Sequence, residues 1–330
     1  MTIATTSMAA ITQDKYGGVD VLQQGDVLVP SPGRGEVRVR VAAASINRGD
    51  IHLMEGLPLM LRLFMGLRAP RQRTRGMDVS GVIDAVGEGV TSLRVGDEVF
   101  GVAKGSFAEY ALADPKKLAI KPDAVSFEDA AAVAVAGCAA LRGLRDSGRL
   151  AAGARVLVLG ASGGVGSFAV QIAKAMGAHV TGVCRTAKIA AVETFGADAV
   201  LDYTTQRLGD AGETWDLILD AGGHRSLDEL RGVLAPRGTL VIVGSETDGA
   251  LLGGFDRTLR AGLLSPFVPQ RLVGLTSVET SADLEELAQL MQEGALRPRI
   301  DRMLPLTETA AGIRLVQEGL ITGKVVIAVG

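Results

Sequence analysis

Residues 160–166, with the sequence Gly-Ala-Ser-Gly-Gly-Val-Gly, have the composition and spacing of a turn that holds a pyrophosphate. They follow the apolar run 156–159 and precede a stretch of helical periodicity over 165–176. Glycine lets backbone N–H groups approach a phosphate, and the next helix presents its positive end to it. The alternative is a glycine-rich turn without a ligand, because the spacing G-x-x-G-x-x-G is not the commonest one. The position at a strand–helix junction favours a dinucleotide contacted by Ser162, Gly163, Gly164 and Val165.

The segment after the next predicted strand distinguishes between nicotinamide cofactors. Enzymes selective for NAD usually carry Asp or Glu about 20 residues beyond the glycines, where it binds the ribose hydroxyls. Here Cys184, Arg185 and Lys188 follow strand 180–183, and the first carboxylate is Glu193. Arg185 and Lys188 can pair with a 2′-phosphate, which a carboxylate would repel. They are otherwise two solvated cations at a helix start. The missing acid and the two bases together predict NADPH.

These motifs lie in a pattern of six short apolar strands that mostly alternate with helices, which predicts a doubly wound parallel sheet. The strands are expected at 155–159, 179–183, 199–201, 217–220, 239–243 and 272–275. Before residue 120 the pattern is different, with short strands expected at 37–41, 79–87 and 98–102 and separated by glycine. Such a pattern is typical of a small barrel. A helix from Ser126, a helix over 282–294 and a strand over 324–329 are also expected.

Composition narrows the class of protein. The length of 330 residues is enough for two domains, and 47% hydrophobic with 22% charged residues indicates a folded chain. A net charge of −3 gives no reason to expect nucleic acid or a membrane as partner, although 68–75 is a short basic run. Two cysteines allow neither a disulfide framework nor a four-thiolate zinc site. Without a signal peptide pattern or a long apolar run, a cytoplasmic protein is expected.

Several of these motifs together resemble the medium-chain dehydrogenase/reductase superfamily, in its zinc-free quinone oxidoreductase-like branch. The resemblance covers almost the whole chain and rests on 16–18, 21–22, 44–50, 76–81, 95–101, the glycine turn and 323–327. It implies an α/β fold with a GroES-like β-rich catalytic domain over 1–123 and 280–330. It also implies a Rossmann domain with a doubly wound parallel sheet that binds NADPH over 124–279, and a homodimer.

The resemblance also bears on the chemistry. Zinc-dependent members hold the metal with a Cys, a His-Glu pair and a later Cys, where this chain has Asn47, Met77-Asp78 and Val135. These side chains do not form a zinc site. The implied reaction is therefore metal-free hydride transfer to a small apolar quinone or an α,β-unsaturated carbonyl. An enoyl or polyketide-tailoring reductase is an alternative, and so is a non-catalytic NADPH-binding protein.

By the same resemblance, Asn47, Asp50 and His52 would line the pocket beside the nicotinamide. Relatives often have tyrosine at the position of His52, so this histidine either donates a hydrogen bond or proton, or is structural. Asp50 either lines the pocket or braces a loop. Ala139 stands where relatives often have a cofactor-binding threonine. Further contacts with the cofactor are expected from residues that follow later strands, namely Tyr203, Ala221, Gly222, Val243, Gly244, Ser245, Leu275, Thr276 and Ser277.

Two apolar stretches keep more than one interpretation. Residues 57–67 follow the predicted pocket segment directly and form either a hydrophobic lid for a bulky substrate or a packed or dimer surface. Residues 263–269, which precede the last strand of the cofactor sheet, are expected at a cleft or at a contact between subunits.

Overall fold

Two large β-sheets organise the chain, one in each of the units into which it divides. The computed structural model describes residues 6–210, 212–244, 255–275 and 278–330. Unit 1 comprises Met1–Val135 and Glu279–Gly330, and unit 2 comprises Ala136–Val278. The division falls within helix α3 (Phe127–Arg142), whose first turn is capped by the Ser126 hydroxyl accepting the N–H of Asp129. No helix among the described residues is long and apolar enough to span a bilayer.

The unit 1 sheet places β15 and β3 side by side, and both strands lead to the candidate site. Its strand order is β14-β15-β3-β4-β5-β7, with β6 also paired to β3. Among the described strand pairs of this sheet, only β14–β15 is parallel. The strands are β3 (Val37–Ser45), β4 (Asp78–Val86), β5 (Glu98–Val102), β6 (Tyr110–Ala113), β7 (Leu118–Ile120), β14 (Ile300–Pro305) and β15 (Lys324–Ala328). A separate hairpin pairs β1 (Ser7–Thr12) with β2 (Gln23–Leu28).

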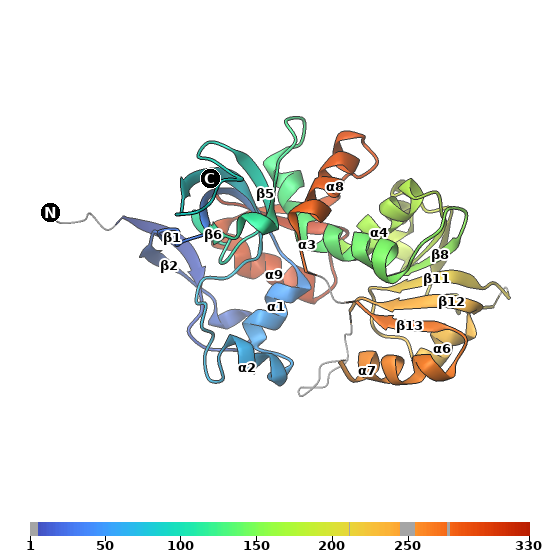
Figure 1. The fold of residues 1–330 in the computed structure, drawn as a ribbon. Helices are drawn as coiled ribbons and strands as arrows, with labels where there is room; N and C mark the ends of the chain where they lie inside the picture. Colours follow the sequence, from blue (N-terminus) through green and yellow to red (C-terminus); the bar gives the residue numbers. More distant parts are fainter. Residues whose placement is uncertain (1–5, 211, 245–254, 276–277) are drawn as a thin grey trace. The chain divides into compact units, whose positions relative to one another are not determined.

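The unit 2 sheet confirms the predicted doubly wound fold. Its six strands are all parallel, in the order β10-β9-β8-β11-β12-β13. They are β8 (Arg155–Leu159), β9 (His179–Cys184), β10 (Ala199–Asp202), β11 (Trp215–Asp220), β12 (Leu234–Ile242) and β13 (Arg271–Gly274). Helix α4 (Gly164–Ala175) covers one face, and α6 (Leu227–Gly232) and α7 (Phe255–Leu264) cover the other (Figure 1). A short helix, α5 (Ile189–Thr194), follows β9.

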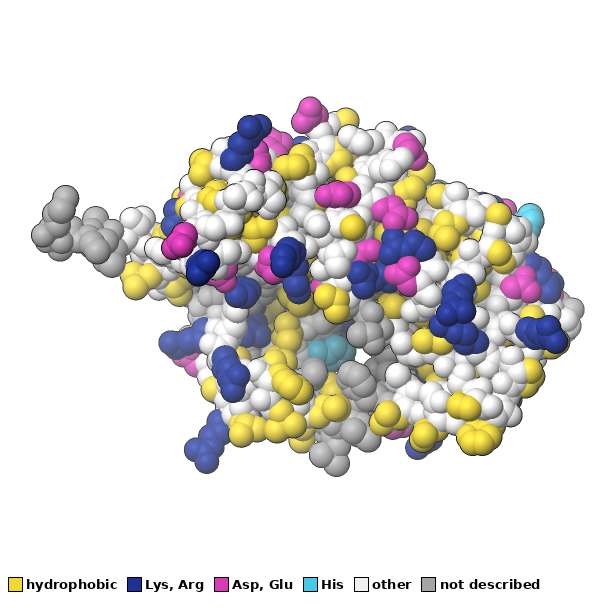
Figure 2. Space-filling view, in the orientation of Figure 1, with side chains coloured by type: hydrophobic (Ala, Val, Ile, Leu, Met, Phe, Trp, Pro, Cys, Tyr) yellow, Lys and Arg dark blue, Asp and Glu magenta, His cyan; other side chains and the backbone are white. Residues whose placement is uncertain are grey.

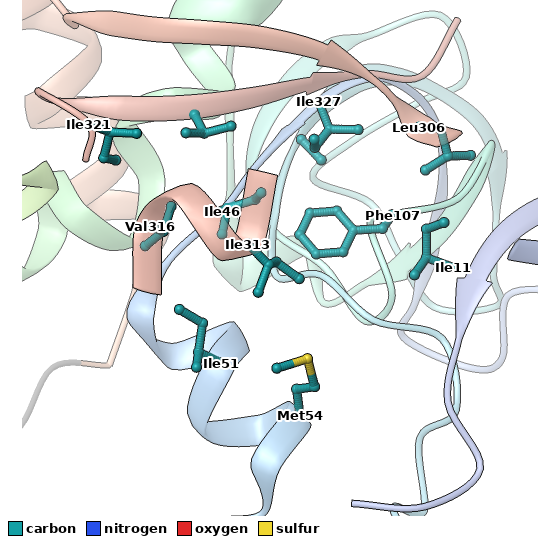
Figure 3. Close-up of a cluster of buried hydrophobic side chains, with 12 residues drawn as sticks. Ile11, Ile46, Ile51, Met54, Phe107, Leu306, Ile313, Val316, Ile321 and Ile327 are labelled. Atoms are coloured by element: carbon teal, nitrogen blue, oxygen red, sulfur yellow. The ribbon is translucent and has the colours of Figure 1, made fainter. Parts of the chain in front are cut away.

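A buried apolar cluster fixes helix α1 (Arg48–Glu55), the element that carries the predicted catalytic residues. Figure 3 shows Ile51 and Met54 of α1 facing Ile313 and Val316 of α9 (Thr309–Gln317). Ile46, from the end of β3, lies in the same cluster. Burial of such side chains provides about 1.5–3 kcal/mol each, so the start of α1 is firmly held. The remaining helices of unit 1 are α2 (Arg62–Met65) and α8 (Ser281–Gln292).

Candidate functional site

Asn47 lies between the end of β3 and the first turn of α1, in a polar cluster buried under both elements. It is the N-cap residue of α1, with extended backbone angles, and its side chain is buried. Its Nδ2 donates a hydrogen bond of 2.8 Å to Oδ2 of Asp78, and its Oδ1 accepts one from Nζ of Lys324. Both ends of the amide are thus held by charged side chains, which fixes the orientation of Asn47.

Asp78 and Lys324 are the charged centre of this cluster, and sequence reasoning assigned a role to neither. Nζ of Lys324 lies 3.3 Å from Oδ2 of Asp78, and both side chains are almost completely buried. Oδ2 of Asp78 also accepts a hydrogen bond from the Ser45 hydroxyl, and Oδ1 accepts one of 2.9 Å from the N–H of Val135. A buried ion pair persists only when its remaining polar atoms are satisfied in this way. The signal available in the sequence was one acid at the start of a strand and one lysine at the start of another.

Asp50 lies on the first turn of α1 and braces the loop that precedes it. Its Oδ2 accepts a hydrogen bond of 2.8 Å from the N–H of Asn47, while its Oδ1 is buried without a hydrogen-bond partner in the described part of the chain. Burial raises the pKa of Asp50 to about 7, and the negative charge of Asp78 adds to the rise. The hydrogen bond from Asn47 and the charges of Lys324 and Arg75 act in the opposite direction. Of the two interpretations of Asp50, the geometry favours the bracing one.

His52 is the exposed member of the three predicted pocket residues. It follows Ile51, which points into the buried cluster, and its side chain emerges about 100° further round the helix, at an exposed position. Its carbonyl accepts the N–H groups of Gly56 and Leu57, which ends the helix. An exposed imidazole on a rigid helix is accessible to a small molecule, which the buried Asp50 carboxylate is not.

The positions that hold zinc in relatives contain a donor set that does not suit the metal. Among the described residues, no group of three or more His, Cys, Asp and Glu side chains is placed to hold a metal ion. The carboxylate of Asp78 is already engaged by Lys324, Asn47, Ser45 and a backbone N–H. In the part of the chain that the structure describes, the cation in contact with these oxygen atoms is the ammonium of Lys324.

In unit 2 the glycine turn links β8 to α4 in a shape that side chains would disrupt. Gly160 has a φ of +72°, a conformation in which glycine is favoured. A Cβ on Gly166 would lie 2.0 Å from the carbonyl oxygen of Gly160, so α4 can start this close to β8 only with glycine there. Gly163 caps α4, and the helix begins one residue before the predicted start. A turn of this shape at the start of a helix is compatible with a bound pyrophosphate.

At the carboxyl end of β9 the structure brings together Cys184, Arg185 and Tyr203. The N–H of Tyr203 donates to the carbonyl of Cys184, and the Tyr203 side chain is half exposed. Burial raises the pKa of the Cys184 thiol to about 11, with the charge of Asp202 adding to the rise, so this group is neutral where an NAD enzyme carries a carboxylate. Arg185 and Lys188 flank the same turn, partly exposed.

The nearest acid to this turn, Asp202 at the end of β10, is engaged in its own loop. Its Oδ2 accepts a hydrogen bond of 2.5 Å from the Thr186 hydroxyl. Its Oδ1 accepts the hydroxyl and the N–H of Thr204. The hydrogen bonds from Thr186 and Thr204 keep the pKa of Asp202 below its ordinary value, so it is ionised but already satisfied.

Two further predicted contacts, Ala221 and Gly222, lie in the turn after β11, directly beside the glycine turn. A Cβ on Gly160 would be 3.2 Å from the nitrogen of Gly222, which measures how closely the turns approach. The N–H groups of Val243 and Gly244 donate to the carbonyl of Asp220 and so join the turn after β12 to the same edge. The N–H of Leu275 donates to Ile242, whereas Ser245, Thr276 and Ser277 lie outside the described residues.

Asp220 and Arg257 order this edge, and the sequence did not identify either of them as functional. Oδ1 of Asp220 accepts the N–H groups of Gly222 and Gly223, at 3.2 and 2.9 Å. Oδ2 accepts Nη2 of Arg257, which reaches it from α7, and both side chains are buried. Nε and Nη1 of Arg257 have no hydrogen-bond partner among the residues that the structure describes. A doubly wound fold binds its ligand at this edge of the sheet. Here the edge carries the glycine turn 160–166, the turn with Arg185 and Lys188, and the turn after β11 that Asp220 holds, and these features fit a dinucleotide.

Comparison with known families agrees with this geometry. Residues 33–123 match the family described as alcohol dehydrogenase GroES-like domain, and 195–327 match the zinc-binding dehydrogenase family. The quinone oxidoreductase of Sus scrofa is 32% identical to this chain, with 97% of each chain covered. The protein belongs to the medium-chain dehydrogenase/reductase superfamily. It lies in the quinone oxidoreductase-like branch, whose members are oxidoreductases.

Other members of this superfamily extend the comparison. The NADPH-dependent alkenal/one oxidoreductase of Arabidopsis thaliana is 30% identical over 97% of this chain and 79% of its own length. The solved structure of the quinone oxidoreductase from Coxiella burnetii superposes with a TM-score of 0.84 at 26% identity, covering 98% of this chain and all of that one. A mycobacterial structure complexed with NADPH superposes with a TM-score of 0.82 at 26% identity, covering 97% and 99%. The expected GroES-like and Rossmann folds are thereby confirmed, as is a nicotinamide-dependent family.

Proposed function

We propose that this dehydrogenase/reductase is a zinc-independent, NADPH-dependent reductase of quinones or of α,β-unsaturated carbonyl compounds. The observation that carries the proposal is the charge at the end of β9, where Arg185 and Lys188 flank a neutral Cys184. The nearest acid, Asp202, is satisfied by Thr186 and Thr204, so it is not free to hold the ribose hydroxyls of NAD. Arg185 and Lys188 are then the groups that bind the 2′-phosphate.

When bound, the reduced nicotinamide supplies a hydride, and the protein contributes orientation and hydrogen bonds. In unit 1 the Asp78–Lys324 pair and Asp50 hold Asn47 in one orientation, while the imidazole of His52 lies exposed on the same helix. We assign His52 to the oxygen of the acceptor, which gains negative charge as the hydride arrives. Asn47 is assigned to the pocket wall beside it, and Asp50 to positioning Asn47.

Zinc independence rests on the same cluster. Asp78 and Asn47 already bind the ammonium of Lys324, and Met77 and Val135 are poor zinc ligands. Metal analysis of the purified protein tests this part of the proposal directly. We expect zinc far below one atom per chain, with full activity after dialysis against a chelator. Stoichiometric zinc, or activity that the chelator removes and zinc restores, contradicts it.

The homodimer expected from the sequence is proposed to form through unit 2. Leu259 and Leu263 of α7 are exposed, and Phe267, in the turn that follows, has an exposed fraction of 85%. The neighbouring strand β13 is an edge of the parallel sheet, and α7 packs against it. Apolar side chains exposed together beside an open sheet edge are typical of a contact between subunits. Sedimentation velocity of Phe267→Ser should then show a shift from dimer to monomer.

Oxidation of NADPH, followed by absorbance with a panel of acceptors, tests the reaction. Quinones and enones should be reduced, while simple ketones and aldehydes should not react, since the proposed zinc-independent site has no metal to polarise their carbonyl group. If only α,β-unsaturated acyl thioesters were reduced, the result would favour the alternative of an enoyl reductase of a biosynthetic pathway. Tight NADPH binding without turnover of any acceptor would support a non-catalytic protein and contradict the proposal.

A further inference from the structure

Residues 59–67 form a rigid apolar projection from unit 1, here called the apolar knob. Arg62 holds it from within: its guanidinium lies 4.5 Å from the centre of the Tyr16 ring, and its Nε donates to the carbonyl of Gly56. The Tyr16 hydroxyl donates a hydrogen bond of 2.8 Å to the carbonyl of Gly66. The N–H of Gly66 donates in turn to Arg62. The backbone of the knob is therefore fixed by its own contacts with unit 1.

The side chains that this backbone presents are apolar and exposed. Leu63, Phe64 and Leu67 have exposed fractions of 64%, 76% and 66%. Leu59 and Met60 are exposed beside them, and the hydrophobic side chains over α1 and α2 are visible in the lower part of Figure 2. Single exposed apolar residues are common, but a contiguous group on a fixed scaffold marks an interaction surface.

Exposed positive charge lies next to the knob in the sequence. The chain from Leu57 to Arg75 contains five arginines, Arg62, Arg68, Arg71, Arg73 and Arg75, and no lysine or acidic residue. Arg68 and Arg71 are exposed, and neither forms an ion pair with a described residue. Arg73 pairs with Asp14, and Arg75 is buried. The net charge of −3 for the whole chain therefore hides a local surface of the opposite sign.

We propose that the apolar knob docks unit 1 on an anionic phospholipid bilayer. Leu63, Phe64 and Leu67 would enter the boundary between headgroups and acyl chains, and Arg68 and Arg71 would contact lipid phosphates. Interfacial segments combine these two features, because apolar insertion and attraction to anionic lipid add together. The charge around the knob selects this partner, since a purely apolar contact between two copies would bring the arginines of each into mutual repulsion. Nucleic acid is disfavoured because four of the five exposed apolar side chains, all except Phe64, are aliphatic and offer no face on which bases can stack.

This docking is independent of the cofactor chemistry, so it is tested without turnover. The full-length protein is sedimented with phosphatidylcholine vesicles, with and without phosphatidylglycerol, in about 0.1 M and about 1 M salt. We expect binding only with phosphatidylglycerol, and loss of binding at the higher salt. Arg68→Gln with Arg71→Gln should weaken binding by about 25-fold, since each arginine near an anionic surface contributes about fivefold. Phe64→Ser with Leu67→Ser should weaken binding to vesicles that contain phosphatidylglycerol by at least about tenfold.

Matched controls come from the same unit. Leu28 and Arg34 are exposed away from the knob, and Leu28→Ser with Arg34→Gln should bind vesicles like the unchanged protein. Thermal unfolding of every variant identifies loss of fold. No binding of the unchanged protein to anionic vesicles overturns the proposal, as does equal binding by the knob variants.

Two other results would also overturn it by assigning the knob a different role. If vesicle binding is unchanged but Phe64→Ser raises KM for a water-soluble enone without lipid, the knob is a lid for substrate. If vesicle binding is unchanged but the same variant alters the sedimenting mass, it is a contact between copies of the chain.

Discussion

Lys324 and Asp78 form an ion pair inside unit 1, with Nζ 3.3 Å from Oδ2. Lys324 also donates a hydrogen bond to the side chain of Asn47, and Asp78 accepts one from it. The three residues come from the start of β15, the start of β4 and the N-cap of α1. Two strand ends therefore determine how the first residue of the candidate catalytic helix is oriented. Removing one member of such a cluster strongly lowers the free energy of unfolding, because it leaves a buried polar or charged group without its partner.

Removal of the cation from this pair should therefore be strongly destabilising. Lys324→Met leaves the buried carboxylate of Asp78 without its counter-ion, and we expect the free energy of unfolding to fall by about 3–5 kcal/mol. Urea denaturation measures the change. Lys104→Met is the matched control in the same unit, because Lys104 is exposed and pairs with Glu36 at the surface. Lys104→Met should lower the free energy of unfolding by about 1 kcal/mol or less. Similar losses for both variants would contradict the assigned role of the buried pair.

The buried carboxyl of Asp50 should make stability depend on pH in a defined direction. Because burial raises its pKa to about 7, the folded protein binds this proton more tightly than the unfolded chain. Stability attributable to Asp50 is therefore complete below the unfolded pKa near 4 and is lost as the pH rises through 7. Asp50→Asn, which cannot ionise, should gain roughly 2–3 kcal/mol relative to the unchanged protein between about pH 5 and about pH 8.

Urea unfolding of both proteins at several pH values checks the prediction for Asp50. Asp26→Asn serves as the control for the loss of one carboxylate, because Asp26 is exposed on β2. A stability difference for Asp50→Asn that stays constant from about pH 5 to about pH 8 would show that the carboxyl titrates normally.

The fold could be predicted because local pattern and tertiary structure agree in this chain. The strand expected at 98–102 is β5, and the run at 155–159 is β8, with the same bounds. Strand β12 was expected to start at 239 but starts at Leu234, across a stretch containing Pro236 and Gly238. Those residues disfavour a strand locally, and pairing with Trp215 of β11 overrides that preference.

The site was less predictable, for a physical reason. The glycines of 160–166 and the lack of an acidic residue directly after β9 can be read from the sequence. The glycine turn and the basic turn with Arg185 and Lys188 could therefore be inferred from it. Arg257 pairs with Asp220 across 37 residues, and Lys324 pairs with Asp78 across 246. No local pattern signals which acid and base will be buried together, because that depends on how the sheet and helices pack.

Selectivity for the 2′-phosphate should depend on Arg185. Arg185→Ala removes a charge-assisted contact that only NADPH can make, so its Kd should rise by about ten- to a hundredfold while the Kd of NADH changes little. Titration calorimetry with both cofactors measures the two values. Arg207→Ala is a suitable control, since Arg207 is exposed in the same unit and lies beyond the basic turn. Equal losses for NADPH and NADH would remove Arg185 from the 2′-phosphate site.

The brace formed by Arg257 should affect both cofactors alike, in contrast to Arg185. Arg257→Met leaves Asp220 buried without its cation, which loosens the turn held by the N–H groups of Gly222 and Gly223. We expect the Kd values of NADPH and NADH to rise by a similar factor. The free energy of unfolding should fall by about 3 kcal/mol or more. Arg260 lies on the same helix and forms an exposed ion pair with Asp256, so Arg260→Met should leave cofactor affinity and the free energy of unfolding nearly unchanged. A selective loss of NADPH would place Arg257 at the 2′-phosphate instead.

The glycine turn is tested most directly at Gly166. In Gly166→Ala the new Cβ would meet the carbonyl oxygen of Gly160 at 2.0 Å, so either α4 or the turn must move. Displaced N–H groups no longer converge on a pyrophosphate, and affinity for both nicotinamide cofactors should fall by at least about a hundredfold, as expected when charge-assisted hydrogen bonds are lost. Gly262→Ala, where a Cβ meets nothing within 4 Å, controls for a helical glycine. Because Ala favours helix, that control should bind normally and unfold at the same or a higher temperature. Normal cofactor affinity in Gly166→Ala would mean that the pyrophosphate is held elsewhere.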